Sequence, residues 1–244
     1  MTFHMLRIGH DPAGFSAWAA RQRLLRPGVD PGYAWHAILR AAFADAAPKP
    51  FRPIEPSGGA PYLLAYSDHD AAALRERAAT LAEPAVAAVL DLAAMVSKPM
   101  PEAFPNGARF EVELRVRPVL RVDRDGDRRR TRERDAFLVA IEKAPGDRRI
   151  DREAIYRDWL AGRLDNAGAA VKPGNLRVLA QRRSRALRRN GDRTLIAAEG
   201  PDVIMSGGVT VREPARFADA VRRGIGRHRA FGFGMMLLRP PPAG

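Results

Sequence analysis

Two successive series of short apolar segments, separated by proline and glycine, constrain the fold of this chain most strongly. The spacing of apolar residues assigns each segment, because helices repeat every 3.6 residues and strands every two. The first series predicts a strand, two helices, a hairpin and a helical stretch broken by proline, in the order 3–8, 15–25, 31–47, 51–55 with 62–67, and 71–95. It therefore predicts a mixed α+β unit.

The second series follows a proline-rich connection around residues 99–107. It predicts a long strand, a charged stretch, a helix, a strand hairpin, a further strand, a helix and a last strand, in the order 108–122, 123–134, 152–164, 176–187 with 194–198, 202–211, 214–223 and 235–239. The hairpin turn is expected at Asn190-Gly191-Asp192, and Gly207-Gly208 indicates a bulge.

The architecture is predicted from the order of elements that the two series share. Strand, helix, two strands, helix and strand is the order of a βαββαβ unit. We therefore expect an α+β protein with two tandem ferredoxin-like (RRM-like, βαββαβ) domains, at residues 1–98 and 108–244. The two halves share no sequence repeat, so the duplication is inferred from element order.

Composition narrows the classes of function. Lys and Arg number 41 against 28 Asp and Glu, and the resulting formal net charge of +13 attracts polyanions such as nucleic acids. The lack of cysteine excludes disulfides and thiolate metal sites. No secretory signal is visible at the N-terminus, and charged residues interrupt the apolar stretch 71–95. We therefore expect a cytoplasmic protein that does not enter a membrane.

A glycine-rich segment near the C-terminus is the strongest local pattern. Two Gly-apolar-Gly pairs, 224–226 and 232–234, enclose five residues with a basic tip. Glycine permits positive φ and close backbone approach, and bared amide groups beside cations can hold a phosphate backbone. The alternative is a tight helix-to-strand connection without a ligand. The residues expected to contact RNA here are Gly224, Gly226, Arg227, His228, Arg229, Gly232 and Gly234.

Two side chains that handle protons, Tyr33 and His36, lie three residues apart on the second predicted helix and so share a face. RNA cleavage without a metal needs a base for the 2′-OH and an acid for the leaving 5′-oxygen, and imidazole titrates near neutral pH. The pair is a candidate catalytic centre, although it also suits the semi-polar flank of an amphipathic helix. No acidic or histidine cluster has metal-ligand spacing, so we expect neither metal nor cofactor.

An acid-free basic run at 181–189 includes Arg182, Arg183 and Arg185 on the predicted hairpin. Alternate side chains of a strand point to one face. A-form RNA hides its base edges in a deep, narrow major groove, so a basic hairpin reads mainly the shape of the backbone. A second basic stretch, 121–134, is diluted by acidic residues and is typical of a solvated loop.

Several of these features together resemble the CasE family, the CRISPR repeat endoribonucleases of type I-E systems. The likeness lies in the glycine pattern, in the Tyr and His three apart on a long helix, and in segments 51–55, 110–118 and 135–138. The resemblance implies two ferredoxin-like halves and a catalytic pair, Tyr33 and His36. It also implies that the stem of an RNA hairpin is held by Arg182, Arg183 and Arg185.

The same resemblance implies a metal-independent endoribonuclease that binds the stem-loop of CRISPR repeat RNA. We expect such an enzyme to cut at the 3′ base of the stem by 2′-OH attack and to leave a 2′,3′-cyclic phosphate. Mature crRNA stays bound, and the expected partners are repeat RNA, crRNA and other subunits of the Cascade surveillance complex. Two alternatives remain open: a non-catalytic RRM-like subunit that holds a guide-RNA end, and a ribosome-associated basic protein without preference for a repeat hairpin.

Overall fold

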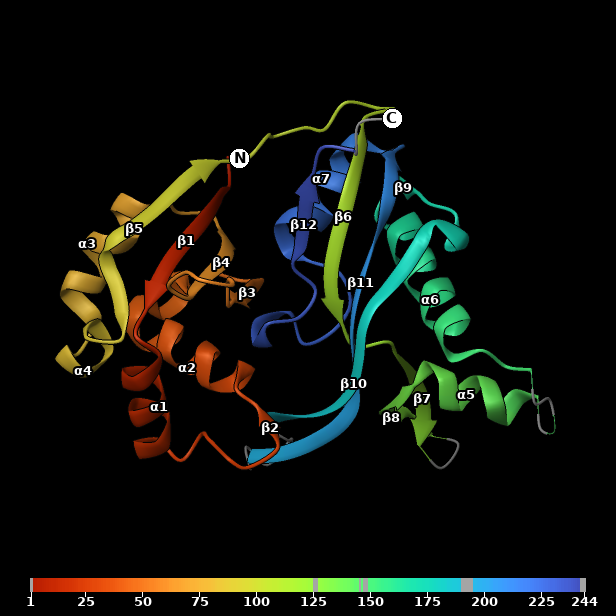
Figure 1. Cartoon of the computed structure of the whole chain (residues 1–244), viewed down its shortest axis with the longest axis horizontal. Coiled ribbons are helices and arrows are strands. Elements are labelled where there is room, and N and C mark those ends of the chain that lie inside the picture. The colour runs from red at the N-terminus through yellow and green to blue at the C-terminus, as the bar shows by residue number, and fades with distance from the viewer. Residues whose placement is uncertain (1, 125–126, 145, 147–148, 190–194, 242–244) are drawn as a thin grey trace.

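Two sheets lie side by side in the computed structural model, which describes residues 2–124, 127–144, 146, 149–189 and 195–241 (Figure 1). A long connection leads from the sheet of the first half over to the sheet of the second half (Figure 1). Helices and strands are mixed along the chain, so the expected α+β class is confirmed.

The first half forms a four-stranded antiparallel sheet with helices packed on one face. Its elements are β1 (His4–His10), α1 (Pro12–Arg21), β2 (Val29–Asp30), α2 (Gly32–Phe43), a 3-10 turn (Ala44–Ala46), β3 (Phe51–Ile54), β4 (Tyr62–Ser67), α3 (Ala71–Leu81), α4 (Pro84–Ala87) and β5 (Leu90–Pro99). The sheet order is β3-β4-β1-β5, and β2 lies outside this sheet. Along β1, Leu6 and Ile8 enter the helix-side core while Met5 packs on the other face, as the two-residue period of a strand requires.

In the second half, four strands of the main sheet lie in the same spatial order as the four strands of the first sheet. Its elements are β6 (Arg109–Val116), β7 (Val119–Arg124), β8 (Asp127–Asp135), α5 (Ala136–Lys143), α6 (Arg152–Asn166), β9 (Ala169–Ala170), a 3-10 turn (Pro173–Asn175), β10 (Leu176–Arg189), β11 (Leu195–Val211), α7 (Pro214–Arg223), a 3-10 turn (Arg229–Phe231) and β12 (Met236–Arg239). The main sheet runs β12-β6-β11-β10-β2, and β7 with β8 forms a separate hairpin.

Several contacts join the two halves. The short strand β2 leaves the first half and pairs in parallel with β10, where Arg185 lies opposite Val29. Phe3 and Tyr66 of the first sheet are buried in the hydrophobic core of the second half. The Tyr66 hydroxyl donates a hydrogen bond to the Met236 carbonyl oxygen at 2.8 Å. The sheets are therefore held together by packing as well as by the connecting chain.

The helical stretch expected over 71–95 is wrong in its last part. Helices α3 and α4 are present, but Leu90–Pro99 forms the edge strand β5 against β1. The register between these strands shifts near Arg7, and this irregularity obscures the alternation expected of a strand. The buried Leu90 and Met95 are five residues apart, an odd spacing that regular strand alternation would place on opposite faces.

Three strand boundaries also differ from the expectation. The segment 108–122 is two strands, β6 and β7, because Pro118 has no N–H to continue the ladder. Residues 195–198 and 202–211, expected as two strands, belong to one strand, β11, which the Gly200-Pro201 pair does not interrupt. The bulge lies at Leu179 on β10, not at Gly207-Gly208. The turn expected at 190–192 lies outside the described residues.

In the described part of the chain, no helix has both the length and the apolarity needed to cross a bilayer.

Candidate active site

Helix α2 places the two side chains of the predicted catalytic pair next to each other. Its buried face carries Trp35, Ile38 and Leu39, so Tyr33 and His36 fall on a half-exposed flank. Their ring centroids lie 6.3 Å apart. The three-residue spacing therefore brings both side chains to one position on the surface of the helix.

The glycine-rich loop packs directly against the start of this helix. The Phe231 ring lies 5.4 Å from the His36 ring and 5.5 Å from the Tyr33 ring. A Cβ atom added at Gly32 would lie 2.1 Å from the Phe231 carbonyl oxygen, so this approach requires glycine. Two segments that are far apart in the sequence, and that were predicted separately, thus form one site.

The protonation state of His36 follows from its surroundings. Burial lowers the pKa of His36 below its ordinary value, and the nearby charges of Arg40 and Lys49 lower it further. Since the ordinary value is 6.5, the imidazole is mainly neutral at pH 7. A neutral imidazole has a free lone pair and can accept a proton.

The loop is closed by backbone hydrogen bonds that its glycines permit. The Ile225 amide donates to the Gly234 carbonyl oxygen at 2.8 Å, and the Gly234 amide donates to the Arg115 carbonyl oxygen at 2.7 Å. Gly224 and Gly234 both have φ near +76°, a left-handed region that favours glycine. A Cβ atom at Gly234 would lie 2.2 Å from the Ile225 carbonyl oxygen. The predicted glycine pattern therefore allows the backbone of the loop to pack closely on itself and form these hydrogen bonds.

The basic tip of the loop is bound to the β7–β8 hairpin. His228 exposes 6% of its side chain, and its Nε2 lies 2.9 Å from a Glu133 carboxylate oxygen. Arg227 also pairs with Glu133. Burial raises the pKa of Glu133, but the contacts with His228 and Arg227 outweigh it and hold that pKa at about 2. In this structure, Glu133 therefore occupies two of the loop side chains that were expected to contact RNA, Arg227 and His228.

The three β10 arginines predicted to hold RNA are exposed. Arg182 donates to Asp202 at 2.9 Å with 67% of its side chain exposed, and Arg183 donates to Glu199 at 2.6 Å with 49% exposed. Arg185 is exposed as well, next to the residues of β2. Ion pairs at this exposure contribute little to stability, so the guanidinium groups remain available to another anion.

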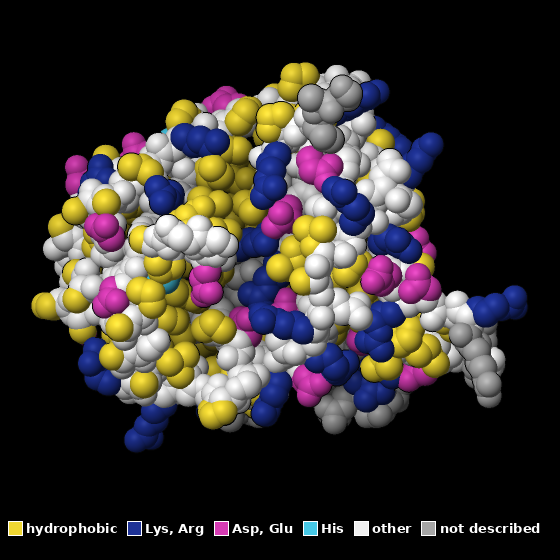
Figure 2. All heavy atoms as spheres, viewed as in Figure 1, with side chains coloured by type: hydrophobic (Ala, Val, Ile, Leu, Met, Phe, Trp, Pro, Cys, Tyr) yellow, Lys and Arg dark blue, Asp and Glu magenta, His cyan; other side chains and the backbone are white. Residues whose placement is uncertain are grey.

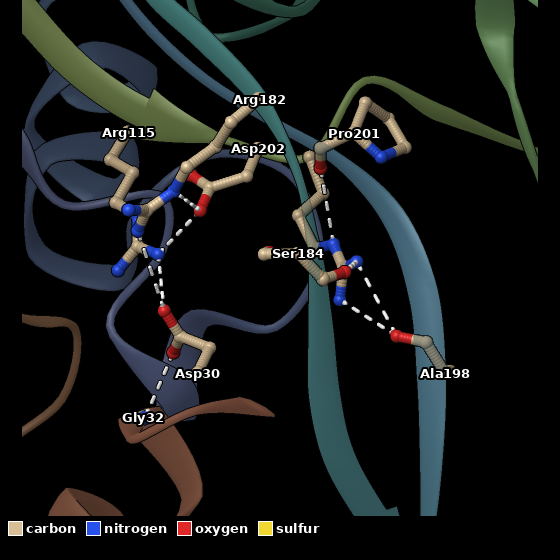
Figure 3. A network of polar contacts seen from close by, with 9 residues as sticks. Asp30, Gly32, Arg115, Arg182, Ser184, Ala198, Pro201 and Asp202 are labelled. Carbon is tan, nitrogen blue, oxygen red and sulfur yellow. Dashed lines mark hydrogen bonds and ion pairs between the residues drawn. The ribbon is translucent and has the colours of Figure 1, made fainter. Parts of the chain in front are cut away.

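A buried ion network, which sequence reasoning missed, connects Arg182 to the start of α2 (Figure 3). Arg115 of β6 donates to both Asp202 oxygens, at 2.8 and 2.6 Å, and pairs with Asp30. The other oxygen of Asp30 accepts from the Gly32 amide at 2.9 Å (Figure 3). Burial raises the pKa of Asp202, but Arg115 and then Arg182 lower it more. The sequence did contain a signal of this network, because Arg115 stands between apolar neighbours on a predicted strand.

A second buried arginine, Arg117, braces the β10–β11 hairpin. It exposes 2% of its surface and donates to the Ser184 carbonyl oxygen at 2.7 Å and the Pro201 carbonyl oxygen at 3.2 Å. Gly200 leaves the space that its guanidinium occupies, since a Cβ atom there would lie 2.8 Å from Nη2. Arg117 thus holds the two strands of the hairpin that carries the exposed arginines.

A cleft of about 840 Å³ lies between the halves, beside the glycine loop. We call it the Lys49 cleft, and it is lined by residues 45–49, 66–69, 222–223 and 226–231, with Glu133. Phe231 contacts the His36 and Tyr33 rings and also lines this cleft. On the face shown in Figure 2, Lys and Arg side chains follow the second half along the seam between the halves, opposite hydrophobic side chains of the first half.

Within the described ranges, no three His, Asp or Glu side chains come together as ligands for a metal ion.

Comparison with known proteins places this geometry in a family. Several solved structures share the fold of this protein over nearly the whole chain. The CRISPR endoribonuclease Cse3 bound to a 19-nucleotide RNA has a TM-score of 0.64 at 21% identity, covering 98% of this chain and 100% of that chain. Thermus thermophilus Cse3, bound to an RNA that represents a pre-cleavage complex, has a TM-score of 0.65 at 18% identity with the same coverage.

A chain of a CRISPR RNA-guided surveillance complex has a TM-score of 0.56 at 18% identity, again over 98% of this chain and 100% of its own length. Identities this low establish a shared fold and leave residue roles to be argued from this chain. A search of curated proteins finds no sequence match. The family model described as CRISPR associated protein matches residues 4–240. The expected CRISPR relationship is confirmed, and the chain belongs to the CRISPR associated protein family.

Proposed function

We propose that this protein is a metal-independent endoribonuclease that cuts CRISPR repeat RNA at the 3′ base of its stem-loop. The observation that carries the proposal is His36, whose pKa is lowered by burial and by Arg40 and Lys49, seated between Tyr33 and the glycine loop. Its family and its shared fold with an RNA-bound endoribonuclease support the same activity.

His36 acts as the general base in this proposal. It removes the proton of the 2′-OH, and the 2′-oxygen attacks the adjacent phosphorus. The bond from phosphorus to the 5′-oxygen breaks, which leaves a 2′,3′-cyclic phosphate on one product and a 5′-OH on the other. The leaving 5′-oxygen takes a proton from the hydroxyl of Tyr33, whose ring centroid lies 6.3 Å from that of His36.

Binding of the RNA stem falls to the β10 surface. Arg182, Arg183 and Arg185 stand on a hairpin that the buried Arg117 braces. The network of Arg115, Asp30 and Asp202 sets this hairpin relative to α2, so the stem and His36 keep a fixed relation. The loop residues Gly224, Gly226, Arg227, His228, Arg229, Gly232 and Gly234 would contact the backbone near the cut, once phosphate replaces Glu133 at the loop cations.

The domain organisation follows the same proposal. Both halves have the succession βαββαβ and the spatial order fourth, first, third, second strand, namely β5-β1-β4-β3 and β12-β6-β11-β10. We infer two ferredoxin-like domains, at 1–98 and 108–244, with the β7–β8 hairpin and α5 inserted in the second. Retention of crRNA, a cytoplasmic location and assembly with other Cascade subunits complete the proposal, since one relative of the same fold belongs to a surveillance complex.

A cleavage assay tests the activity. Labelled repeat RNA is incubated with excess EDTA and either the unchanged protein or His36→Ala. We expect cleavage by the unchanged protein alone, with a cyclic phosphate at the new 3′ end. Cleavage by His36→Ala at the unchanged rate would refute the assigned base. Tight binding without cleavage by either protein would instead identify a non-catalytic subunit that holds a guide-RNA end.

A further inference from the structure

We propose that the Lys49 cleft binds single-stranded RNA on the 3′ side of the cut, beyond the base of the stem. This inference rests on the proposed function and assigns a second RNA site to it. The cleft has a volume of about 840 Å³, which is enough for a few nucleotides, and its two walls come from the two halves of the protein.

The cleft begins at the candidate active site. Phe231 forms part of its wall and contacts the His36 and Tyr33 rings. Lys49 lies on the opposite wall and is close enough to lower the pKa of His36, after burial and Arg40. A strand whose scissile phosphate sits at His36 therefore continues into the cleft.

The order of elements along the chain decides whether the RNA on the 5′ or the 3′ side of the cut enters the cleft. The hairpin strand β10, which we assign to the stem, pairs with β2 immediately before α2 begins. Residues 45–49 of the cleft follow immediately after the other end of α2. Helix α2 has 12 residues and so is about 18 Å long. His36 lies between the two surfaces, and because the stem ends at the cut, the segment in the cleft is the 3′ segment.

The charges in the cleft suit a phosphate backbone. Lys49 is exposed, and Arg223 exposes 67% of its side chain while paired with Asp219 of its own helix at 2.8 Å. The acidic Asp45 is neutralised by Arg77, and Asp68 is neutralised by Arg222 at 2.7 Å. Exposed cations such as these exchange a carboxylate for a phosphate at little cost.

The half-buried ring of Phe231 gives the cleft an aromatic surface beside its cations. Stacking on an aromatic ring accepts any base, and backbone contacts carry no sequence information. The site therefore holds RNA of any sequence, unlike the stem surface, which requires a hairpin.

The test measures binding of uncleavable RNA. A stem-loop carries a 2′-deoxy nucleotide at the cut, so no nucleophile is present, and it ends at the cut or extends by about four to eight nucleotides on the 3′ side. For the unchanged protein, we expect the 3′ extension to increase affinity roughly tenfold, because two or more phosphates gain cationic contacts. An equal extension on the 5′ side should change affinity less than twofold.

The variant Lys49→Gln with Arg223→Gln should lose this gain and bind both RNAs as the unchanged protein binds the short one. The matched control is Arg216→Gln, because Arg216 also stands exposed on α7, in an ion pair with the N-cap residue Glu213, outside the Lys49 cleft. It should keep the full gain. Far-UV circular dichroism and the melting temperature would show that all variants fold.

Two results would overturn the inference while the proposed function stands. One is stem-loop binding that the 3′ extension does not strengthen, and the other is an equal gain from a 5′ extension. Failure of the unchanged protein to bind any stem-loop or to cut the 2′-hydroxyl RNA would remove the proposed function, and with it this inference.

Discussion

At the residue scale, the environment of His36 makes a prediction about pH. Burial, Arg40 and Lys49 lower its pKa, in that order, so removing the Arg40 charge raises the pKa. A general base loses activity as pH falls through its pKa. For the unchanged protein, we expect the single-turnover rate to fall on the acid side with a midpoint below pH 6.5, and Arg40→Gln should move that midpoint to higher pH.

The matched control is Arg21→Gln, because Arg21 is likewise an exposed arginine in the last turn of a helix. It should leave the midpoint unchanged. A rate that falls on the alkaline side instead, with Arg40→Gln shifting that limb, would assign His36 as the acid.

Gly32 offers a second residue-scale prediction. Its contact with the Phe231 carbonyl oxygen excludes a side chain, although alanine is ordinarily the better helix residue. Gly32→Ala should destabilise the protein by about 1 to 3 kcal/mol through overpacking, and should slow cleavage by displacing Phe231 from His36. Urea unfolding and the cleavage rate measure the two effects.

Gly162 provides the control for that substitution. It lies within helix α6, and a Cβ atom there would meet nothing within 4 Å. Gly162→Ala should therefore stabilise the protein by up to about 1 kcal/mol and leave cleavage intact. If Gly32→Ala behaves in the same way, the close packing of loop and helix is incorrect.

At the element scale, Glu133 joins the β7–β8 hairpin to the glycine loop. Its folded pKa of about 2 lies below the ordinary 4.5, so its contribution to stability is present above pH 4.5 and is lost as pH falls toward 2. Glu133→Gln should lower the free energy of unfolding at pH 7 by about 1.5 to 3 kcal/mol, because a charge-assisted contact with His228 and Arg227 is lost.

Chemical unfolding at several pH values measures this effect, with Glu142→Gln as the control. Glu142 also pairs with an arginine, Arg134, but its side chain is 55% exposed, so its substitution should change little. A Glu133→Gln effect that stays constant down to pH 2 would contradict the assigned pKa.

Elements also show what the sequence could and could not predict. Helix α7 was predicted residue for residue at 214–223, because its apolar spacing is regular and Pro214 marks its start. Strand β5 was missed because its pairing with β1 is irregular, and the length of β11 was missed because the Gly200-Pro201 pair imitates a turn. Local patterns predict elements well where tertiary pairing does not override them.

The candidate site also combines features that the sequence could predict with features that it could not. Tyr33 and His36, and the glycine pattern, could be found from spacing alone, because each is a local signal. Their contact through Phe231 could not, since it joins residues almost 200 positions apart. The contact of Glu133 could not be predicted either, because this residue stands in a charged stretch that is typical of a solvated loop. Its role depends on His228, a partner that only the fold brings close.

At the scale of the whole molecule, the two halves meet through polar as well as apolar contacts. Arg52 of the first half pairs with Glu113 of the second at 2.6 Å, with both side chains largely buried. Arg115 then connects Asp30, the last residue of β2 before α2, to Asp202 on β11. The position of the candidate base relative to the proposed RNA surface thus depends on buried charges at this junction.

Removing the central cation of that network should destabilise the whole molecule. Arg115→Gln leaves the buried carboxylates of Asp30 and Asp202 with the exposed Arg182 in place of a buried cation, at a cost of about 3 to 5 kcal/mol. Adding Asp30→Asn and Asp202→Asn removes both charges and should recover much of the melting temperature. Cleavage should remain impaired in the triple variant, because Arg182 and α2 lose the shared ion network that aligns them. A triple variant as unstable as the single one would mean that packing of Arg115, rather than its charge, holds the halves in place.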